Sequence, residues 1–307
     1  MARRRRGRDI DGVVLLDKPK GLSSNQALGR VRWLYQAAKA GHTGTLDPMA
    51  TGLLPVCLGE ATKFSSFALE ADKGYIARVQ LGVSTDSGDA EGKVVAEHSL
   101  TALSESLLRS TLEAFKGEIE QVPPMFSALK HQGRPLYELA REGKEIKRAP
   151  RQVTLYDIAL REFDLESGWF DIEVTCSKGT YIRTLAMDIG EKLGCGAHLT
   201  ALRRIKTGRF DASALLSIEA IEAAGDTRDA WLLPLDCLID HLPRLDIDAE
   251  RAARLNLGQQ IDAVEGREPL AVDSTVRIYC DERLLGLVTV TAQGLLAPRR
   301  LMRSTAT

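Results

Sequence analysis

The sequence predicts an α/β (α+β) fold, in which a largely antiparallel sheet with flanking helices is followed by a small C-terminal β-barrel. Three observations predict it. The chain has 307 residues, enough for roughly two domains. Apolar runs typical of strands alternate with amphipathic runs typical of helices as far as residue 210. Beyond about residue 245, short strands separated by polar turns follow one helical segment.

The chain opens with a strand and a helix. Residues 12–16 are a short apolar run that ends at the turn Asp17-Lys18-Pro19. Ser23 or Ser24 is then expected to cap a helix. The apolar positions of this helix recur at helical spacing: Leu28, Val31, Leu34 and Tyr35.

Further helices are expected over residues 61–69 and 103–115, and a half-buried strand over 75–81. Val122-Pro123-Pro124 then opens a basic stretch without clear periodicity that continues to about residue 151. Only residues 135–141 of this stretch suit a short helix. Thirty irregular residues inside a compact domain indicate a functional loop or an inserted element.

The main domain is expected to end with a hairpin, a helix and a strand. The hairpin pairs residues 153–163 with 169–176 across Ser167-Gly168. The helix covers about 180–193, and the strand covers 201–210. The domains predicted are therefore 12–245, with the insertion at about 122–151, and 246–307.

The C-terminal part has a different character. A short helix over 249–255 precedes strands at 276–280, 284–290 and 295–298. Short strands and polar turns over some sixty residues predict a small β-barrel appended to the main domain.

Charge is unevenly distributed, although the net charge is only −1. Residues 1–11 form an arginine-rich tail, and basic residues also gather at 144–151, 203–209 and 299–303. Separated basic patches suit RNA or DNA bound on one face. For any single patch, solvated surface charge is an equally good interpretation.

Several classes of protein and site are not favoured. No apolar run approaches the ~20 residues of a membrane helix, and no signal-peptide core follows the arginines, so we expect a cytoplasmic protein. The five cysteines and five histidines are scattered without metal-ligand spacing, so we expect no metal. Phosphate-loop, dinucleotide-binding and G-x-S-x-G motifs do not occur.

Residues 41–60 are the most informative segment of the chain. Asp47 lies in its middle, five residues after His42, among four glycines. Pro48 biases Asp47 toward extended geometry, which places the carboxylate on a rigid turn. Such a turn can present a reactive group at the floor of a cleft. The alternative interpretation is an ordinary Asp-Pro turn in a glycine-rich loop.

Two other segments carry polar residues that a purely structural role would not need. Tyr75 stands at the head of a strand, and Tyr181 and Arg183 lie in the first turn of a helix. A carboxylate can act as a nucleophile, and an arginine beside it keeps it ionised. Aromatic rings can stack on a base extruded from an RNA loop. This set fits chemistry on a nucleobase without a cofactor.

The motifs together resemble the TruB family of tRNA pseudouridine synthases. The segment Gly41-His-Thr-Gly-Thr-Leu-Asp-Pro-Met-Ala-Thr-Gly-Leu-Leu-Pro is similar to the family signature. Four further segments, beginning at Gly12, Gln121, Cys176 and Gly196, follow in the family's order as far as about residue 210. The last sixty residues are similar to the PUA-like RNA-binding domain of bacterial members.

The resemblance implies a pseudouridine-synthase-type fold and the isomerisation of the T-loop uridine at tRNA position 55 to pseudouridine. The base is detached from C1′ of its ribose, rotated and rejoined through C5 after it has been flipped out of the stack. The resemblance implies no metal or cofactor. It also implies a monomer that binds the tRNA T-arm without an obligate protein partner.

The resemblance also assigns the catalytic residues. Asp47 is the nucleophile, attacking either C1′ or the uracil ring. Arg183 pairs with Asp47 and holds it charged. Tyr75 stacks on the flipped uracil and is the candidate for removing the C5 proton.

Substrate-binding residues follow by the same resemblance. Tyr181 and Leu202 line the pocket, although both are also suited to the core. His42 fills space in the T-loop or contacts its phosphates, unless it is an ordinary loop histidine. Lys18 buttresses the pocket. The insertion at 122–151, with Lys130, clasps the RNA.

Two other functions fit these residues less well. A non-catalytic tRNA-binding or RNA-folding module on the same fold would not need a carboxylate–arginine pair next to RNA. A hydrolytic base-modifying enzyme such as a zinc deaminase needs a His/Cys ligand set with a glutamate, and the sequence shows none.

Overall fold

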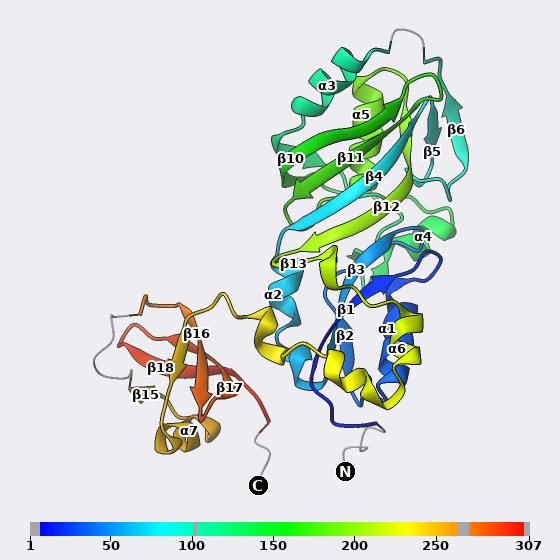
Figure 1. The fold of residues 1–307 in the computed structure, drawn as a ribbon. Coiled ribbons are helices and arrows are strands. Elements are labelled where there is room, and N and C mark those ends of the chain that lie inside the picture. Colours follow the sequence, from blue (N-terminus) through cyan, green and yellow to red (C-terminus); the bar gives the residue numbers. More distant parts are fainter. Residues whose placement is uncertain (1–6, 101–102, 263–269, 304–307) are drawn as a thin grey trace.

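The computed structural model describes residues 7–100, 103–262 and 270–303. Most of the predicted basic tail lies outside the described residues. Figure 1 shows an elongated main part, built on one large sheet, and a smaller C-terminal part beside its lower end. The predicted mixed α/β fold class is confirmed.

The main sheet has nine strands, and its principal order is β1-β3-β12-β4-β11-β10-β7. The strands are β1 (Gly12–Lys18), β2 (Ala40–His42), β3 (Thr51–Leu58), β4 (Lys73–Leu81), β7 (Gly117–Gln121), β10 (Arg151–Asp164), β11 (Trp169–Cys176), β12 (Ala197–Thr207) and β13 (Phe210–Asp211). Strand β2 pairs with β3, and β13 pairs with β12.

One junction divides this sheet into two halves. Every described pairing in it is antiparallel except that of β3 with β12, which is parallel and joins Thr51 to Arg203 and Gly52 to Arg204. We call this β3–β12 junction the seam. On one side of it lie β1, β2 and β3, and on the other lie β12, β4, β11, β10 and β7.

Seven helices and four short 3-10 turns are described along the chain. The helices are α1 (Ser24–Leu34), α2 (Ser65–Glu70), α3 (Glu105–Glu113), α4 (Leu136–Arg141), α5 (Ile182–Lys192), α6 (Ile218–Ala223) and α7 (Ala249–Asn256). Short 3-10 turns are η1 (Gly59–Lys63), η2 (Ala212–Ala214), η3 (Gly225–Trp231) and η4 (Leu235–Leu238). Two small hairpins are formed by β5 (Val83–Thr85) with β6 (Val94–Glu97), and by β8 (Lys130–His131) with β9 (Arg134–Pro135).

Two of the helices position the site. Ser23 caps α1 by accepting from the Gln26 amide, and the Gln26 side chain accepts from the Ser23 amide, so both groups are satisfied. Helix α5 buries an apolar face that includes Ile182, Leu185 and Ile189, and it packs against β12. This packing fixes where its first turn points.

Three expectations about the elements were wrong. Residues 61–69 are divided between η1 and α2, because Phe64 leaves helical geometry with φ −108° and ψ 1°. The glycine-rich segment contains strand β3, in which seven of the eight residues are buried. The strand expected at 201–210 begins earlier, at Ala197, and ends at Thr207.

The C-terminal part is a curled five-stranded sheet in the order β14-β16-β17-β18-β15, a half-barrel rather than a closed barrel. Its strands are β14 (Arg244–Asp246), β15 (Ile261–Asp262), β16 (Thr275–Cys280), β17 (Arg283–Val290) and β18 (Leu295–Leu301). Its first strand, β14, begins at Arg244.

The two parts share a buried cluster. Val13 and Leu53 of the main sheet and Tyr279 and Leu287 of the C-terminal sheet belong to one apolar core. The Tyr279 hydroxyl also donates to Asp236 Oδ2 at 2.5 Å. The C-terminal part is therefore packed against the main sheet.

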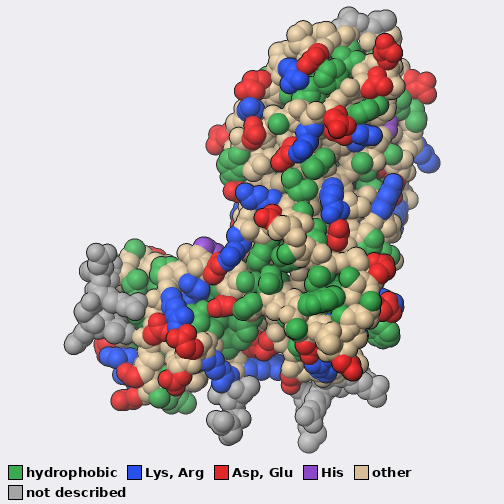
Figure 2. Space-filling model, viewed as in Figure 1, with side chains coloured by type: hydrophobic (Ala, Val, Ile, Leu, Met, Phe, Trp, Pro, Cys, Tyr) green, Lys and Arg blue, Asp and Glu red, His purple; other side chains and the backbone are tan. Residues whose placement is uncertain are grey.

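Charged side chains of both signs are interspersed on the face shown in Figure 2. The basic cluster expected at 203–209 does not form one exposed patch. Arg204 is buried, Arg203 pairs with Asp17, and Arg209 pairs with Asp240.

Candidate active site

Asp47 lies in the loop between β2 and β3, and neighbouring elements hold that loop in place. The Leu46 amide donates to Ser24 Oγ at 2.7 Å, which ties the loop to the first turn of α1. The Ala50 amide donates to the Asp47 carbonyl at 3.0 Å and closes a turn. These bonds fix the loop. The Asp47 side chain is 33% exposed, so its carboxylate remains accessible from solvent.

Arg183 stands behind the carboxylate. Its Nε lies 2.9 Å from Asp47 Oδ2, and its side chain is only 3% exposed. The pair crosses the seam, because Asp47 comes from the half-sheet that contains β3 and Arg183 from the helix packed on β12. Only a folded chain brings them together.

The rest of the Arg183 guanidinium is also engaged. Nη1 donates to the Ser87 carbonyl at 3.0 Å and lies 3.6 Å from Asp89 Oδ2. Nη2 donates to the Phe126 carbonyl at 2.6 Å. A buried arginine with all three nitrogens engaged keeps one orientation, which is the requirement for a preorganised site.

Burial raises the pKa of Asp47 above its ordinary value. Arg183 and Lys18 act against this by stabilising the ionised carboxylate, while the nearby Asp89 carboxylate raises the pKa further. A raised pKa is typical of functional carboxylates, because a less stabilised anion is more reactive.

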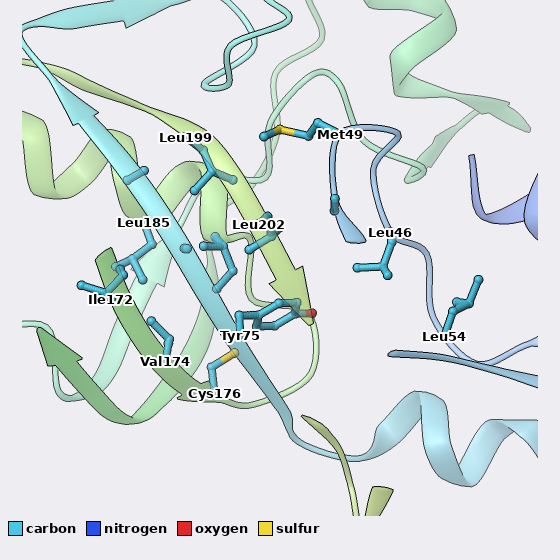
Figure 3. Packing of buried hydrophobic residues seen from close by; sticks show 14 of the residues in the cluster. Leu46, Met49, Leu54, Tyr75, Ile172, Val174, Cys176, Leu185, Leu199 and Leu202 are labelled. Carbon is cyan, nitrogen blue, oxygen red and sulfur yellow. The ribbon is translucent and has the colours of Figure 1, made fainter. Parts of the chain in front are cut away.

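Tyr75 lies on β4, opposite Arg204 of β12. Its ring belongs to the main core together with Leu46 and Leu202. Figure 3 shows the ring beside the end of β12, with its hydroxyl oxygen pointing toward the segment that carries Leu46. Burial raises the pKa of Tyr75, and Arg204 partly offsets the rise.

Leu202 and Tyr181 approach the site from β12 and from the start of α5. Leu202 is 7% exposed in the main core. Tyr181 is the residue before the first turn of α5, and Arg151 lies 5.2 Å from the centroid of its ring. Tyr181 is partly exposed, so it can meet a bound molecule.

His42 ends β2 at the base of the Asp47 loop. Its Nδ1 is buried without a hydrogen-bond partner. Burial and the Arg204 charge lower the pKa of His42, so the ring is neutral at pH 7.

Lys18 is fully buried beneath the loop. Its ammonium donates to the carbonyls of Pro19, Leu22 and Pro48 at 2.8, 2.6 and 3.4 Å. Burial lowers the pKa of Lys18 to about 8. In this structure the side chain supports the loop that carries Asp47.

Three residues of the site were not singled out from the sequence. Asp89 and Arg204 are buried charged residues, and Gln121 is a buried amide that bonds to Tyr181. Asp89 and Arg204 lie among other charged residues and Gln121 follows Glu120, so all three resemble surface positions in the sequence. Arg204 shows what was missed, because it donates to the carbonyls of Leu53 and Gly44 across the seam.

Within the described ranges, no group of three or more His, Cys, Asp or Glu residues is arranged to hold a metal ion. In the same part of the chain, no helix has the length and apolar character needed to cross a membrane.

Three successive segments of the chain match families of pseudouridine synthase domains. Residues 32–182 match the family described as TruB family pseudouridylate synthase, N-terminal domain. Residues 183–240 match the tRNA pseudouridylate synthase B C-terminal domain. Residues 243–302 match the family described as pseudouridine synthase II TruB, C-terminal.

Individual relatives agree over almost the full length. The tRNA pseudouridine synthase B of Chromohalobacter salexigens is 59% identical over 307 residues, covering 99% of this chain and 98% of the relative. That of Methylobacillus flagellatus is 52% identical over 298 residues, covering 96% of each. A solved structure, described as a Cbf5–Nop10–Gar1 complex, superposes with a TM-score of 0.70 at 26% identity, covering 94% of this chain and 84% of that one.

Proposed function

Because the chain belongs to the TruB family of pseudouridine synthases, we propose that it isomerises the uridine at position 55, in the T-loop of tRNA, to pseudouridine. The C1′–N1 bond of the nucleotide breaks and a C1′–C5 bond forms. C5 loses its proton and N1 gains one, so no atoms or electrons are lost and no cofactor or metal is required.

The observation that carries this proposal is the buried Arg183 behind a partly exposed Asp47. Asp47 acts as the nucleophile, attacking either C1′ or the uracil ring. Arg183 fixes the carboxylate in one orientation, so little reorganisation is needed when the substrate arrives. A module that only bound RNA would gain nothing from a carboxylate facing a polyanion.

Tyr75 is proposed to stack on the flipped uracil and to accept the C5 proton on its hydroxyl oxygen, which gives up its own proton in the same step. Its ring is held between the two half-sheets, and its hydroxyl points toward the Asp47 side of the seam. Tyr181 and Leu202 line the pocket, and His42 fills the space left by the extruded base. Lys18 contributes by holding the loop.

RNA is proposed to approach across the motif loop. The insertion at 122–151 clasps the T-arm, and the PUA-like C-terminal part contacts the same tRNA. We expect the protein to act as a monomer on tRNA alone, which a reconstitution from one purified chain tests directly.

The decisive experiment uses a tRNA transcript tritiated at C5 of its uridines. Wild-type protein should release tritium, and carbodiimide-primed reverse transcription should stop once, in the T-loop. Asp47→Asn should bind the transcript and release nothing. Asp171→Asn is the matched control, because Asp171 is also ion-paired with an arginine on the same sheet, Arg78, but lies outside the motif.

Two results would overturn parts of the proposal. Tritium release by Asp47→Asn at the wild-type rate would remove Asp47 as the nucleophile. Tight binding by wild-type protein without release would exclude this substrate and favour a binding or RNA-folding module.

A second pair of variants tests Tyr75. Tyr75→Phe keeps the ring and loses the hydroxyl, whereas Tyr75→Leu loses both. If the ring stacks and the hydroxyl takes the proton, Phe should bind RNA normally and react slowly, and Leu should also bind more weakly. Equal rates for wild type and Phe would exclude the hydroxyl from the reaction.

A further inference from the structure

Gln121 joins the base of the insertion to the start of helix α5. It is the last residue of β7 and is 1% exposed. Its Oε1 accepts from the Tyr181 amide at 2.9 Å, and its Nε2 donates to the Tyr181 carbonyl at 3.3 Å. One carboxamide thus bonds to both backbone groups of a single residue, as a neighbouring strand would. The Tyr181 carbonyl also accepts from the Leu185 amide at 3.0 Å.

Gln121 and Tyr181 connect two segments that matter for the site. The insertion at 122–151 begins immediately after Gln121. Tyr181 is the residue that precedes α5, and no side chain caps the helix there. Arg183 follows two residues later, in the first turn. The Gln121 amide is therefore attached directly to the backbone that aims Arg183.

A second hydrogen bond joins the same two segments of the chain. The Phe126 carbonyl, five residues after Gln121, accepts from Arg183 Nη2 at 2.6 Å. Between the two lie Pro123 and Pro124, which are buried and have fixed φ angles. Residues 121–126 therefore form a stiff connection that contacts the Arg183 segment at both ends, once through its backbone and once through its guanidinium.

We propose that Gln121 is a positioning residue for the reaction: it holds the start of α5 so that Arg183 meets Asp47, and it links that alignment to the insertion. The inference rests on the proposed function. It predicts that loosening this link slows the chemical step far more than it weakens RNA binding, because Gln121 is buried and bonds to the backbone of Tyr181, not to the side chain proposed to line the pocket.

The test compares three variants. Gln121→Met keeps the length of the side chain and removes both hydrogen bonds. Gln121→Glu keeps the acceptor for the Tyr181 amide but loses the donor. Glu118→Gln is the control, an exposed change on the same strand. Single-turnover tritium release at saturating enzyme measures the chemical step, and filter binding measures affinity.

We expect Gln121→Met to slow the single-turnover rate by at least about tenfold, since small displacements of catalytic groups have effects of this order. The single-turnover rate of Gln121→Glu should lie between those of Gln121→Met and wild type. The RNA affinity of every variant should stay within about twofold of the wild-type affinity. If Gln121→Met does not fold, Gln121→Glu decides alone. Wild-type single-turnover rates in the soluble Gln121 variants would overturn the proposal.

Two readouts separate positioning from a merely structural role. If Arg183 is displaced, the pKa of Asp47 rises further, so the acid limb of the rate profile moves to higher pH. In a ¹⁵N spectrum, the Arg183 Nε–H, which faces Asp47, should exchange faster with water. An unmoved acid limb together with unchanged Nε–H protection would contradict the proposal.

The spectrum also distinguishes the two proposals, because it requires no substrate. Loss of Nε–H protection in Gln121→Met, with no tritium release by wild-type protein, would retain the positioning role and reject the proposed reaction.

Discussion

Arg204 and Tyr75 lie directly opposite each other on the antiparallel strands β12 and β4. Residues opposed in this way share one face of the sheet, so the arginine is placed beside the tyrosine ring. Its guanidinium then crosses the seam, where Nε donates to the Leu53 carbonyl at 2.7 Å and Nη2 to the Gly44 carbonyl at 3.1 Å. One buried side chain thereby joins the tyrosine to the loop that carries Asp47.

Arg204→Met is expected to lower both stability and activity. It removes a donor from each of two backbone carbonyls at the seam. An unsatisfied buried polar group costs ~1–3 kcal/mol, so a loss of ~2–6 kcal/mol is expected for the two. Urea unfolding measures the loss. Arg203→Met, which removes a more exposed ion pair with Asp17, is the control and should cost ~1 kcal/mol or less.

Gly52→Ala tests how closely the seam is packed. Gly52 has φ +95°, and a Cβ there would lie 2.3 Å from the Arg204 carbonyl oxygen. Gly21 is a matched control, since it has φ +90° with open space around it. Both changes incur a backbone cost of ~1 kcal/mol, but only Gly52→Ala must also push the half-sheets apart.

We therefore expect Gly21→Ala to remain active and Gly52→Ala to lose most activity together with several degrees of melting temperature. Equal melting temperatures for the two variants would show that the seam can open without cost.

Asp47→Asn should make the protein at least as stable as wild type at pH 7. The folded-state pKa of Asp47 is raised by burial, so folding disfavours the ionised carboxylate. A raised carboxyl pKa means that the folded chain holds its proton at a higher pH than the unfolded chain does. The stability of wild type relative to the Asp47→Asn variant therefore rises as the pH falls through the pKa of Asp47 in the folded chain.

The check is to measure melting temperatures of the two proteins at several pH values from ~4 to ~8. The range starts near the ordinary carboxyl pKa of ~4. A variant that is clearly less stable than wild type at pH 7 would show that the Arg183 pair outweighs the burial cost.

Lys18 and Lys73 should make stability increase in alkaline solution. Burial lowers the pKa of each to about 8, against an ordinary value of 10.5. Between these values the unfolded chain holds protons that the folded chain has released, so the free energy of unfolding gained from each lysine rises with pH across that window.

Lys18→Met should remove the part of this rise that belongs to Lys18. Urea unfolding of wild type and variant at ~pH 7.5 and ~pH 10, on either side of most of the window, gives the difference directly. A difference between the two proteins that does not change with pH would contradict the lowered pKa.

The sequence was most informative where periodicity or capping chemistry decides the structure. The helix was predicted from a serine cap at Ser23 or Ser24 and from its helical spacing, and the structure begins it after Ser23. The hairpin of β10 and β11 was predicted from its turn. Strand β3 was missed because Gly52 and Pro55 are typical of loops. Gly52 is required there by the Arg204 backbone, a contact between segments far apart in the chain.

The site was predictable only in part for the same reason. Asp47, Tyr75 and Arg183 lie in recognisable motifs. Asp89 does not, and Arg204 ends the motif that begins at Gly196 without a role assigned to it. Charged residues are seldom buried without a partner. The partners of these two residues, Arg183 for one and the carbonyls at the seam for the other, become known only when the strand order is known.

The seam also sets a condition on protein synthesis. β1, β2 and β3, with the Asp47 loop between β2 and β3, are made early, while Arg183 and Arg204 are made much later. Chains fold from the N-terminus as they leave the ribosome. A prematurely released fragment that ends before α5 would carry Asp47 without Arg183, the residue that pairs with it. Synthesis must therefore pass α5 and β12 before the loop that carries Asp47 can meet either arginine.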